Sequence, residues 1–94
     1  MTIKEFQQLI EEKYGKRDRE RGTDKTFLWF VEEVGELATA LAGNDHANKK
    51  EELGDVFAWL CTLANINDID LTEAVERYRH RNDGYKWLNV KYKI

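Results

Sequence analysis

Two acidic runs place the strongest constraint on how this chain folds. The first spans Glu32–Glu36 and the second spans Glu52–Asp55, and each lies within sequence whose apolar residues recur at helical spacing. Side chains three or four residues apart lie on the same side of a helix, so each run is expected to present its carboxylates together. The sequence therefore predicts two helices that each carry a pair of acidic side chains on one side.

The two runs lie at matching distances from a predicted turn. Gly43-Asn44 interrupts the helical pattern between them and predicts that the chain folds back there as an antiparallel helical hairpin. Residues equally far from the turn then lie opposite each other, which pairs Glu36 with Glu52 and Glu33 with Asp55. Four unneutralised carboxylates would repel one another and raise each other's pKa values, so we expect a divalent cation between them.

The alternative is that these carboxylates form a solvated acidic face, which is common on charged helices. Their position beside the apolar side of each helix favours the metal site. Mg²⁺ prefers oxygen ligands and, when a few carboxylates hold it, keeps positions for water or phosphate oxygens. We therefore expect Mg²⁺, with Mn²⁺ as a substitute, and phosphoryl chemistry as the leading reaction class.

Composition supports a small helical protein. The chain has 94 residues, no proline and six glycines, and 35% of its residues are charged, which favours long helices over a sandwich or a disordered tail. We expect one domain, residues 1–94, with an all-α fold. A domain of this size buries only roughly 60 to 65% of its unfolded surface, so we expect a homodimer or homotetramer to complete the core.

Charge and the distribution of apolar residues exclude several classes of protein. The net charge of −3 is mild and its signs are interspersed, which argues against binding a nucleic-acid polymer. The single cysteine, Cys61, offers neither a disulfide framework nor a thiolate zinc site. The first residues lack the apolar run of a signal peptide, and no stretch is apolar enough for a membrane span, so we expect a cytoplasmic protein with no membrane partner.

Four helices are expected, joined by polar or glycine-containing segments. They span about residues 2–15, 23–42, 46–66 and 71 to between 82 and 84, with a charged loop over 15–22. Their expected caps are Thr2 with Glu5, then Thr23 or Asp24, then Gly43-Asn44-Asp45, and finally Asp70 with Glu73. The tail, residues 85–94, is expected to form a short strand or to cover a partner subunit.

Each helix of the hairpin is expected to bury one apolar arc and to carry its acidic residues at the edge of that arc. On the second helix the arc comprises Phe27, Phe30, Val31, Val34, Leu37, Ala38 and Leu41, adjoined by Trp29, Glu33, Glu36 and Ala40. On the third helix it comprises Leu53, Val56, Phe57, Leu60, Leu63 and Ala64, flanked by Glu52, Asp55 and Trp59. Small residues at Gly54, Ala58 and Cys61 favour close helix packing, either inside the subunit or with a dimer partner.

Both acidic runs also carry a family resemblance. Residues 26–38, TFLWFVEEVGELA, and residues 50–56, KEELGDV, resemble the paired EExxE and ExxD motifs of MazG-type nucleoside triphosphate pyrophosphohydrolases, and the similarity covers about residues 20–87. The resemblance implies an all-α, four-helix MazG-like bundle that forms homo-oligomers. It also implies Mg²⁺-dependent conversion of nucleoside triphosphates to the monophosphate and pyrophosphate. The residues that match the family's metal ligands are Glu33, Glu36, Glu52 and Asp55.

The resemblance is consistent with a mechanism in which a metal-activated water attacks the α-phosphate and pyrophosphate leaves. Such an enzyme would act on the nucleotide pool and remove unwanted nucleotides from it. Glu32 points away from Glu33 on a helical wheel, so it either orients the water from outside the metal shell or forms a surface ion pair. These two roles stay open.

Substrate contacts are expected from aromatic and basic side chains. Trp29 and Trp59 lie opposite each other about the turn and either stack against a nucleobase or belong to the core. Candidate phosphate contacts are Lys49, Lys50, Arg77, Arg81 and Lys86, each of which is equally well explained as a solvated side chain. The resemblance favours Arg81, Asn82 and Lys86, although Asp83-Gly84-Tyr85 between them departs from the family's more basic composition. His46 and His80 are expected to be surface residues.

Two alternatives to this activity stay open. A related enzyme of the superfamily, such as a dUTP or dCTP hydrolase or a phosphoribosyl-ATP pyrophosphohydrolase, would share the metal chemistry and differ in its base pocket. A non-catalytic helical interaction module would bind the cation for stability alone. The sequence does not determine base or sugar preference, the number of metal ions, or the order of the oligomer.

Overall fold

Four α-helices make up the part of the chain that the structure describes. The computed structural model describes residues 1–80, and no strand occurs among them. The helices are α1 (Ile3–Arg21), α2 (Thr23–Ala42), α3 (His46–Ile66) and α4 (Leu71–His80). The predicted all-α class is therefore confirmed, whereas the end of the fourth helix and the tail at 85–94 lie outside the described residues.

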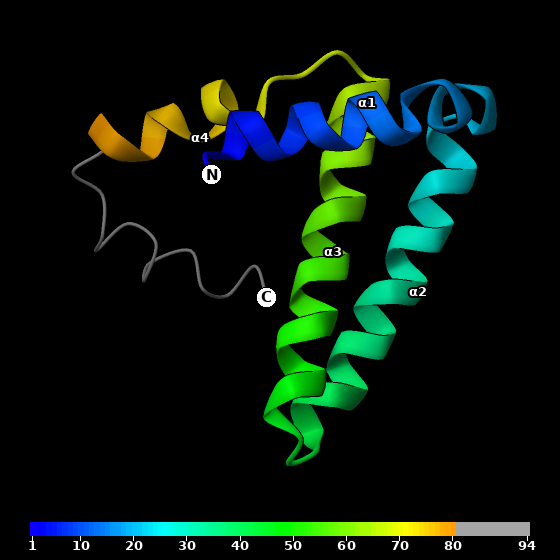
Figure 1. Ribbon diagram of the computed structural model, residues 1–94, viewed down its shortest axis with the longest axis vertical. Helices are drawn as coiled ribbons and strands as arrows, with labels where there is room; N and C mark the ends of the chain where they lie inside the picture. The colour runs from blue at the N-terminus through cyan, green and yellow to red at the C-terminus, as the bar shows by residue number, and fades with distance from the viewer. Residues whose placement is uncertain (81–94) are drawn as a thin grey trace, which may run out of the picture.

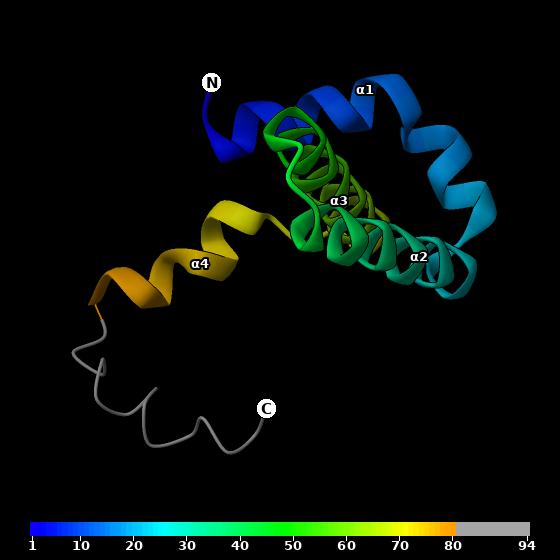
Figure 2. The ribbon, with the colours of Figure 1, turned by 90° about the horizontal axis from the view of Figure 1, so that it is seen from below.

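The two acidic helices form the long arm of the molecule. In Figure 1, α2 descends, the chain turns at residues 43–45, and α3 returns alongside α2 in the opposite direction. Helix α1 crosses this pair at the end away from the turn, and α4 lies beside the N-terminal part of α1 (Figures 1 and 2). Between α1 and the turn, no other described helix packs against α2 and α3, so several sides of this pair are open.

Two of the predicted helix starts have the expected hydrogen bonds. The Thr2 hydroxyl accepts from the backbone N–H of Glu5 at 3.0 Å, and the Glu5 carboxylate accepts from the backbone N–H of Thr2 at 2.7 Å, so the capping box is confirmed. At the start of α3, the Asp45 carboxylate accepts from the backbone N–H of Asn48 at 3.2 Å.

The predicted loop over residues 15–22 is wrong, because α1 continues without interruption to Arg21. Gly15 lies inside the helix. The side chains of Glu11 and Arg19 form an ion pair beside its Cα, with N and O 2.5 Å apart. A Cβ at Gly15 would collide with the Glu11 carboxylate, so the glycine accommodates this crossing. The remaining lysines, arginines and glutamate of the stretch are good helix formers.

The start of α2 also differs from the prediction. The N-cap residue is Gly22, not Thr23 or Asp24, and no side chain caps this helix. Gly22 has a φ of 85°, a value that residues with a Cβ rarely adopt, and it turns the chain sharply from α1 into α2. The helix was expected to be interrupted over eight residues, 15–22, but the interruption is a single glycine.

A buried amide network fixes α1 to the junction between α3 and α4. The Gln7 side-chain amide donates to Asn65 Oδ1 at 2.8 Å and to the Ile69 carbonyl at 2.7 Å, and Asn65 Nδ2 donates back to the Gln7 carbonyl at 3.1 Å. The Gln7 side-chain oxygen accepts from the backbone N–H of Leu71, the first residue of α4. Each buried amide is thereby satisfied, which anchors three helices at one point.

The apolar core between α1 and α3 is small. Phe6 of α1 stacks on Phe57 of α3 with ring centroids 5.5 Å apart. Cys61 is fully buried, whereas a Cβ at Gly54 would meet nothing within 4 Å, so the strip of small residues on α3 is only partly used inside the subunit.

Only part of the predicted apolar arc of α2 is buried. Phe30 and Leu37 are half buried as expected, but Phe27, Val31 and Leu41 are each about half exposed. Thr26, fully buried, and Ala40, 4% exposed, lie on the side that the helix buries. At about 100° per residue, this buried row is rotated by roughly 100° from the exposed row. The buried and half-buried residues of this side are spaced four and three positions apart in turn. They are Thr26, Phe30, Glu33, Leu37 and Ala40.

The predicted arc of α3 is also only partly buried: Val56 and Leu63 are half buried and Ala64 is buried, whereas Leu53, Phe57 and Leu60 are exposed. The half-buried residues of α3 that follow the same alternation are Glu52, Val56, Trp59, Leu63 and Ile66. We call these two rows the inner seam. Glu33 and Glu52 therefore lie within the packing seam between α2 and α3, not at its edge. None of the described helices is long and apolar enough to cross a membrane.

Candidate metal centre and adjoining pocket

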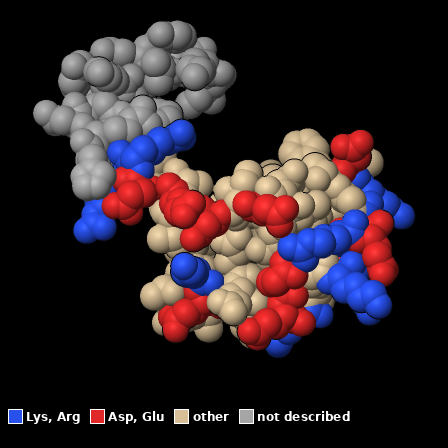
Figure 3. Space-filling view, turned by 90° about the horizontal axis from the view of Figure 1, so that it is seen from above, with Lys and Arg blue, Asp and Glu red and all other residues tan. Residues whose placement is uncertain are grey.

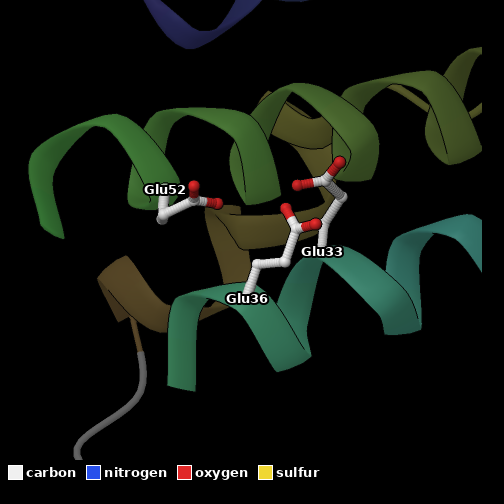
Figure 4. A group of neighbouring side chains, drawn as sticks. All are labelled: Glu33, Glu36 and Glu52. Atoms are coloured by element: carbon white, nitrogen blue, oxygen red, sulfur yellow. The ribbon is translucent and has the colours of Figure 1, made fainter. Parts of the chain in front are cut away.

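Three carboxylates from two helices meet at the inner seam, to which Glu33 and Glu52 belong, whereas Glu36 is exposed beside it. Glu33 and Glu36 lie one turn apart on α2, and Glu52 reaches toward them from α3 (Figure 4). One carboxylate oxygen from each residue lies within 4.8 Å of the other two. We call Glu33, Glu36 and Glu52 the acidic cluster. The turn at residues 43–45 brings these residues together although they are well separated in sequence.

Burial and crowding of like charges raise the pKa values of Glu33 and Glu52. The pKa of Glu33 is raised to about 7, first by burial, then by a hydrogen bond with the Glu36 carboxyl group, and then by the charges of Glu36, Asp55 and Glu52. The pKa of Glu52 is also raised, again first by burial and then by the charges of Glu36, Asp55 and Glu51. Without a cation, the ionised forms of Glu33 and Glu52 are therefore disfavoured in the folded protein.

Two oxygens of the cluster lack hydrogen-bond partners. Glu33 Oε2 and Glu52 Oε2 are buried and accept no hydrogen bond from any described residue. Leaving a buried acceptor unsatisfied costs about 1–3 kcal/mol, and more when the group is charged. A hard divalent cation would satisfy both oxygens and offset the repulsion, and an all-oxygen ligand set is the one that Mg²⁺ prefers. The residues present thus fit a Mg²⁺ ion.

The other predicted acidic site residues lie outside this group. Asp55 is exposed and its oxygens do not join the three that lie within 4.8 Å of one another, although its charge raises the pKa of both Glu33 and Glu52. Glu32 is exposed and makes no ion pair with any described residue. Asp55 is thus a neighbour of the cluster, whereas Glu32 is separate from it.

The two predicted tryptophans meet in the same seam, nearer to α1. Trp29 of α2 and Trp59 of α3 pack edge to face, with ring centroids 5.6 Å apart and an interplanar angle of 87°. The Arg21 guanidinium lies over both rings, 4.6 Å from the Trp29 centroid and 5.2 Å from that of Trp59. The Lys25 ammonium lies 5.6 Å from the Trp29 centroid. We call Trp29 and Trp59 the tryptophan corner.

The corner forms one wall of a pocket of about 820 Å³ between the C-terminal half of α1, the first turns of α2 and the middle of α3. A volume of this size accommodates a drug-sized or nucleotide-sized ligand. The lining residues are Ile10, Tyr14, Arg17, Asp18, Glu20, Arg21, Lys25, Trp29, Ala58, Trp59 and Thr62. Trp29 lies about 6 Å along the helix axis from Glu33, so the pocket adjoins the acidic cluster.

Asp18 and Arg21 are pocket residues that the sequence reasoning missed. Asp18 is 4% exposed, and its Oδ1 accepts from Arg21 Nη2 at 2.6 Å. Arg21 Nε donates to the Thr26 hydroxyl at 2.9 Å, which links α1 to α2. Because residues 15–22 were expected to form a loop, neither side chain was placed against α2. Their spacing of three residues, suited to a helical ion pair, was the available signal.

The predicted basic side chains are dispersed. Lys50 is exposed and Lys49 is half buried, both near the start of α3. Arg77 lies on α4, where its guanidinium sits 5.0 Å from the Tyr78 ring centroid. Arg81, Asn82 and Lys86 lie outside the described residues, and His46 is exposed as predicted. Figure 3 shows basic side chains over the C-terminal half of α1 interspersed with acidic ones, so the face in view carries no continuous field of one sign.

Comparison with known families places the acidic runs in a common domain. Residues 21–83 match the family model described as the MazG nucleotide pyrophosphohydrolase domain. The match covers more than half of the chain and includes the acidic cluster, Asp55 and both tryptophans of the corner. It begins at Arg21, so it leaves out most of α1. A search of curated proteins returned no match.

Proposed function

The chain belongs to the MazG nucleotide pyrophosphohydrolase family, and from this premise we propose that it is a Mg²⁺-dependent nucleoside triphosphate pyrophosphohydrolase. It converts an NTP or dNTP to the monophosphate and pyrophosphate by attack of water at the α-phosphate. The observation that carries the proposal is the acidic cluster, in which α2 and α3 bring three carboxylate oxygens within 4.8 Å of one another inside a packing seam.

Glutamates in such a seam are costly unless they serve a ligand. A seam between two helices is normally filled by apolar side chains, and burying a carboxylate without a partner is unfavourable. Glu33 and Glu52 occupy seam positions and each retains a buried oxygen that no described residue satisfies. The chain therefore stores repulsion at the place where a cation and a triphosphate would bind, and ligand binding relieves it.

The residues have distinct proposed roles. Glu33, Glu36 and Glu52 would hold the ion, and Asp55, exposed beside them, would be a fourth ligand. When bound, Mg²⁺ neutralises the triphosphate and makes a water molecule acidic enough to act as the nucleophile. Glu32 orients that water from outside the cluster. Lys50, Arg81 and Lys86 neutralise the phosphates that the ion does not reach, and the Asn82 amide donates a hydrogen bond to them.

The tryptophan corner is the proposed base site. Its rings lie about one helical turn from Glu33, which leaves room for a sugar between a stacked base and phosphates at the cluster. Trp29 is 39% exposed, so part of its ring is accessible to a ligand. Stacking on an aromatic ring stabilises any base, so the corner contributes affinity without strong selectivity.

Release of pyrophosphate tests the proposed activity directly. Purified protein is incubated with each natural NTP and dNTP and Mg²⁺, and pyrophosphate and orthophosphate are measured separately. We expect pyrophosphate and the monophosphate in equal amounts from at least one nucleotide. Glu36→Gln and Asp55→Asn should abolish this release, whereas Glu12→Gln, an exposed α1 carboxylate distant in sequence from both acidic runs, should not. Orthophosphate as the only phosphate product would contradict the mechanism.

We also propose that the active form is a homodimer or homotetramer assembled on the exposed apolar arc of α2. Phe27, Val31, Val34, Ala38 and Leu41 alternate by four and three positions, as in a helix-packing seam, and all are exposed. On α3, Leu53, Phe57 and Leu60 extend the same pattern. We call this the open seam. A second copy of the α2–α3 pair would fill it as the second half of a four-helix bundle.

The oligomeric state tests this part of the proposal. We expect sedimentation velocity to give a dimer or tetramer, and Val31→Lys to shift it toward the monomer because a charge enters an apolar contact. Thr39→Lys is the matched control, since Thr39 is exposed on α2 and lies outside the open seam. A wild-type monomer at micromolar concentration would contradict the assembly.

A further inference from the structure

The buried carboxylate of Asp18 stands apart from the catalytic carboxylates and has no part in the proposed chemistry. It lies on α1, lines the pocket beside the tryptophan corner and is 4% exposed. Its Oδ1 is bound to Arg21 Nη2, while Oδ2 is buried and accepts a hydrogen bond from no described residue. A buried acceptor is rarely left unsatisfied, and each case calls for an explanation.

We propose that Asp18 reads the edge of the nucleobase, with Oδ2 accepting a hydrogen bond from an exocyclic amino group. The inference rests on the proposed function and names its substrate class as nucleotides with amino-bearing bases. Cytosine, adenine and guanine carry such a group, whereas uracil and hypoxanthine have a carbonyl oxygen at the position where cytosine and adenine carry theirs. A carboxylate attracts the amino group and repels the carbonyl oxygen.

The surroundings of Asp18 hold its carboxylate in one orientation. Arg21 fixes Oδ1 at 2.6 Å and is itself held by its Nε donating to the Thr26 hydroxyl at 2.9 Å. Thr26 in turn donates to the Gly22 carbonyl at 2.6 Å and is fully buried. The chain of contacts runs from α1 through the junction into α2, so Oδ2 cannot rotate away without breaking it. A fixed acceptor gives discrimination that a mobile surface carboxylate does not.

Arg21 also explains how a base would approach. Its guanidinium lies over the rings of Trp29 and Trp59, yet Trp29 is still 39% exposed. A base that enters the pocket therefore stacks on the exposed part of Trp29 beside the guanidinium, which keeps its hydrogen bonds with Asp18 and Thr26. The pocket then presents stacking surfaces and one oriented acceptor to the same ligand.

Matched pairs of nucleotides isolate the amino group. CTP and UTP differ at position 4 of the pyrimidine, and ATP and ITP differ at position 6 of the purine, by an amino group against a carbonyl. For the wild-type protein, we expect kcat/KM for pyrophosphate release to favour the amino member of at least one pair by about tenfold or more, the range for a hydrogen bond to a charged group. Equal values within both pairs, or a preference for the carbonyl members, would overturn the proposal without using any variant.

Asp18→Asn then assigns the preference to this side chain. The amide can donate where the carboxylate only accepts, so the amino-to-carbonyl ratio should fall by about tenfold or more, toward or below one. Glu20→Gln is the matched control, because Glu20 lines the same pocket but is exposed, and its ratio should stay at the wild-type value. If Asp18 only positions Arg21, Asp18→Asn would lower kcat/KM equally for both members of each pair, and that outcome would overturn the proposal.

A binding measurement separates this inference from the proposed function. Calorimetry with CMP and UMP does not depend on turnover, and we expect CMP to bind about tenfold more tightly than UMP, or AMP more tightly than IMP. If no nucleotide releases pyrophosphate but this preference is present and is lost in Asp18→Asn, the proposed activity fails while the base site stands. If pyrophosphate is released and no pair is discriminated, the activity stands and the role of Asp18 fails.

Discussion

The acidic cluster and the tryptophan corner lie in the same seam between α2 and α3, about one helical turn apart, yet they are opposite in character. The cluster brings three carboxylate oxygens within 4.8 Å of one another, and Glu33 and Glu52 each also have a buried oxygen without a described partner. The corner is aromatic, and the Arg21 guanidinium lies over both of its rings. The cluster is therefore unfavourable without a ligand, whereas the corner is satisfied by the protein itself.

This difference teaches which site should control which property. Filling the cluster relieves repulsion, so a cation should affect both stability and rate. A base at the corner relieves no repulsion and only adds a stacking contact, so changes there should alter substrate affinity and selectivity more than the chemical step.

Glu33→Gln should give the largest effect and should separate rate from stability. Removing a metal ligand should lower kcat/KM for pyrophosphate release by about 100-fold or more. The same change removes a buried charge whose pKa is raised to about 7 by burial and by its acidic neighbours, so the metal-free variant should melt at a higher temperature than the metal-free wild type. Activity and thermal melting measured on one preparation check both.

A loss of activity accompanied by a lower melting temperature would break the first half of the comparison, because it would mean that Glu33 stabilises the fold in the absence of a cation. Glu12→Gln is the control, since it makes the same change on α1 and should leave both readings unchanged.

Trp29→Ala should affect substrate affinity before rate. Stacking of a base on an aromatic ring is worth about 1–3 kcal/mol, so we expect KM to rise about tenfold or more with kcat changed less. Trp29→Phe keeps a flat ring and should show a smaller rise. A fall in kcat with KM unchanged would show that the corner supports the chemical step instead of binding the base.

The pH dependence of the metal-free protein follows from the raised pKa of Glu33. A carboxyl group with a higher pKa in the folded state than in the unfolded state binds its proton more tightly when folded, so its contribution is fully present at low pH and is lost as pH rises through about 7. The melting temperature without metal should therefore fall between pH 5 and pH 8.

Mg²⁺ should reverse that fall, and more strongly at pH 8 than at pH 6, because protons compete with the ion for Glu33. Competition by one proton predicts that the half-saturating Mg²⁺ concentration drops about tenfold over this range. A melting temperature that rises with pH in the absence of metal would contradict the crowding of charge in the cluster.

Glu32→Gln should give the smallest effect. Glu32 is adjacent to Glu33 in sequence but exposed and outside the cluster, so a role in orienting water would cost a few-fold in kcat at most, with Mg²⁺ affinity unchanged. The difference in kcat between the Glu32 and Glu33 variants measures how much of the activity depends on a carboxylate lying in the seam. Equal losses for the two variants would mean that the seam does not define the site.

The α2–α3 pair was the most predictable part of the molecule. Its helices end and begin within a residue or two of the expected positions, because Gly43-Asn44-Asp45 combines a helix stop with an N-cap. The matching distances from that turn correctly brought Glu36 near Glu52 and Trp29 near Trp59. The turn and cap residues were sufficient to predict these pairs because both helices belong to one hairpin.

Two features could not be predicted because they depend on tertiary contacts. The more apolar side of α2, with Val31 and Leu41, is the exposed one, and only the contact with α3 selects the side of Thr26 and Ala40. Likewise, the charged stretch ending at Arg21 lacks an apolar stripe, and its helix is fixed by contacts such as Asp18 with Arg21 and Arg21 with Thr26. The pocket beside the tryptophan corner was missed for the same reason.

Titration of a divalent cation into the nucleotide-free protein tests the central claim most directly. Calorimetry with Mg²⁺ or Mn²⁺ at pH 8 should show saturable binding to wild-type protein and no detectable binding to Glu33→Gln/Glu36→Gln, while the Glu12→Gln control binds as the wild type does. Saturable binding that survives loss of both α2 carboxylates would place the ion elsewhere. Absence of binding to the wild type, with and without a nucleoside monophosphate, would remove the basis for a metal centre in the seam.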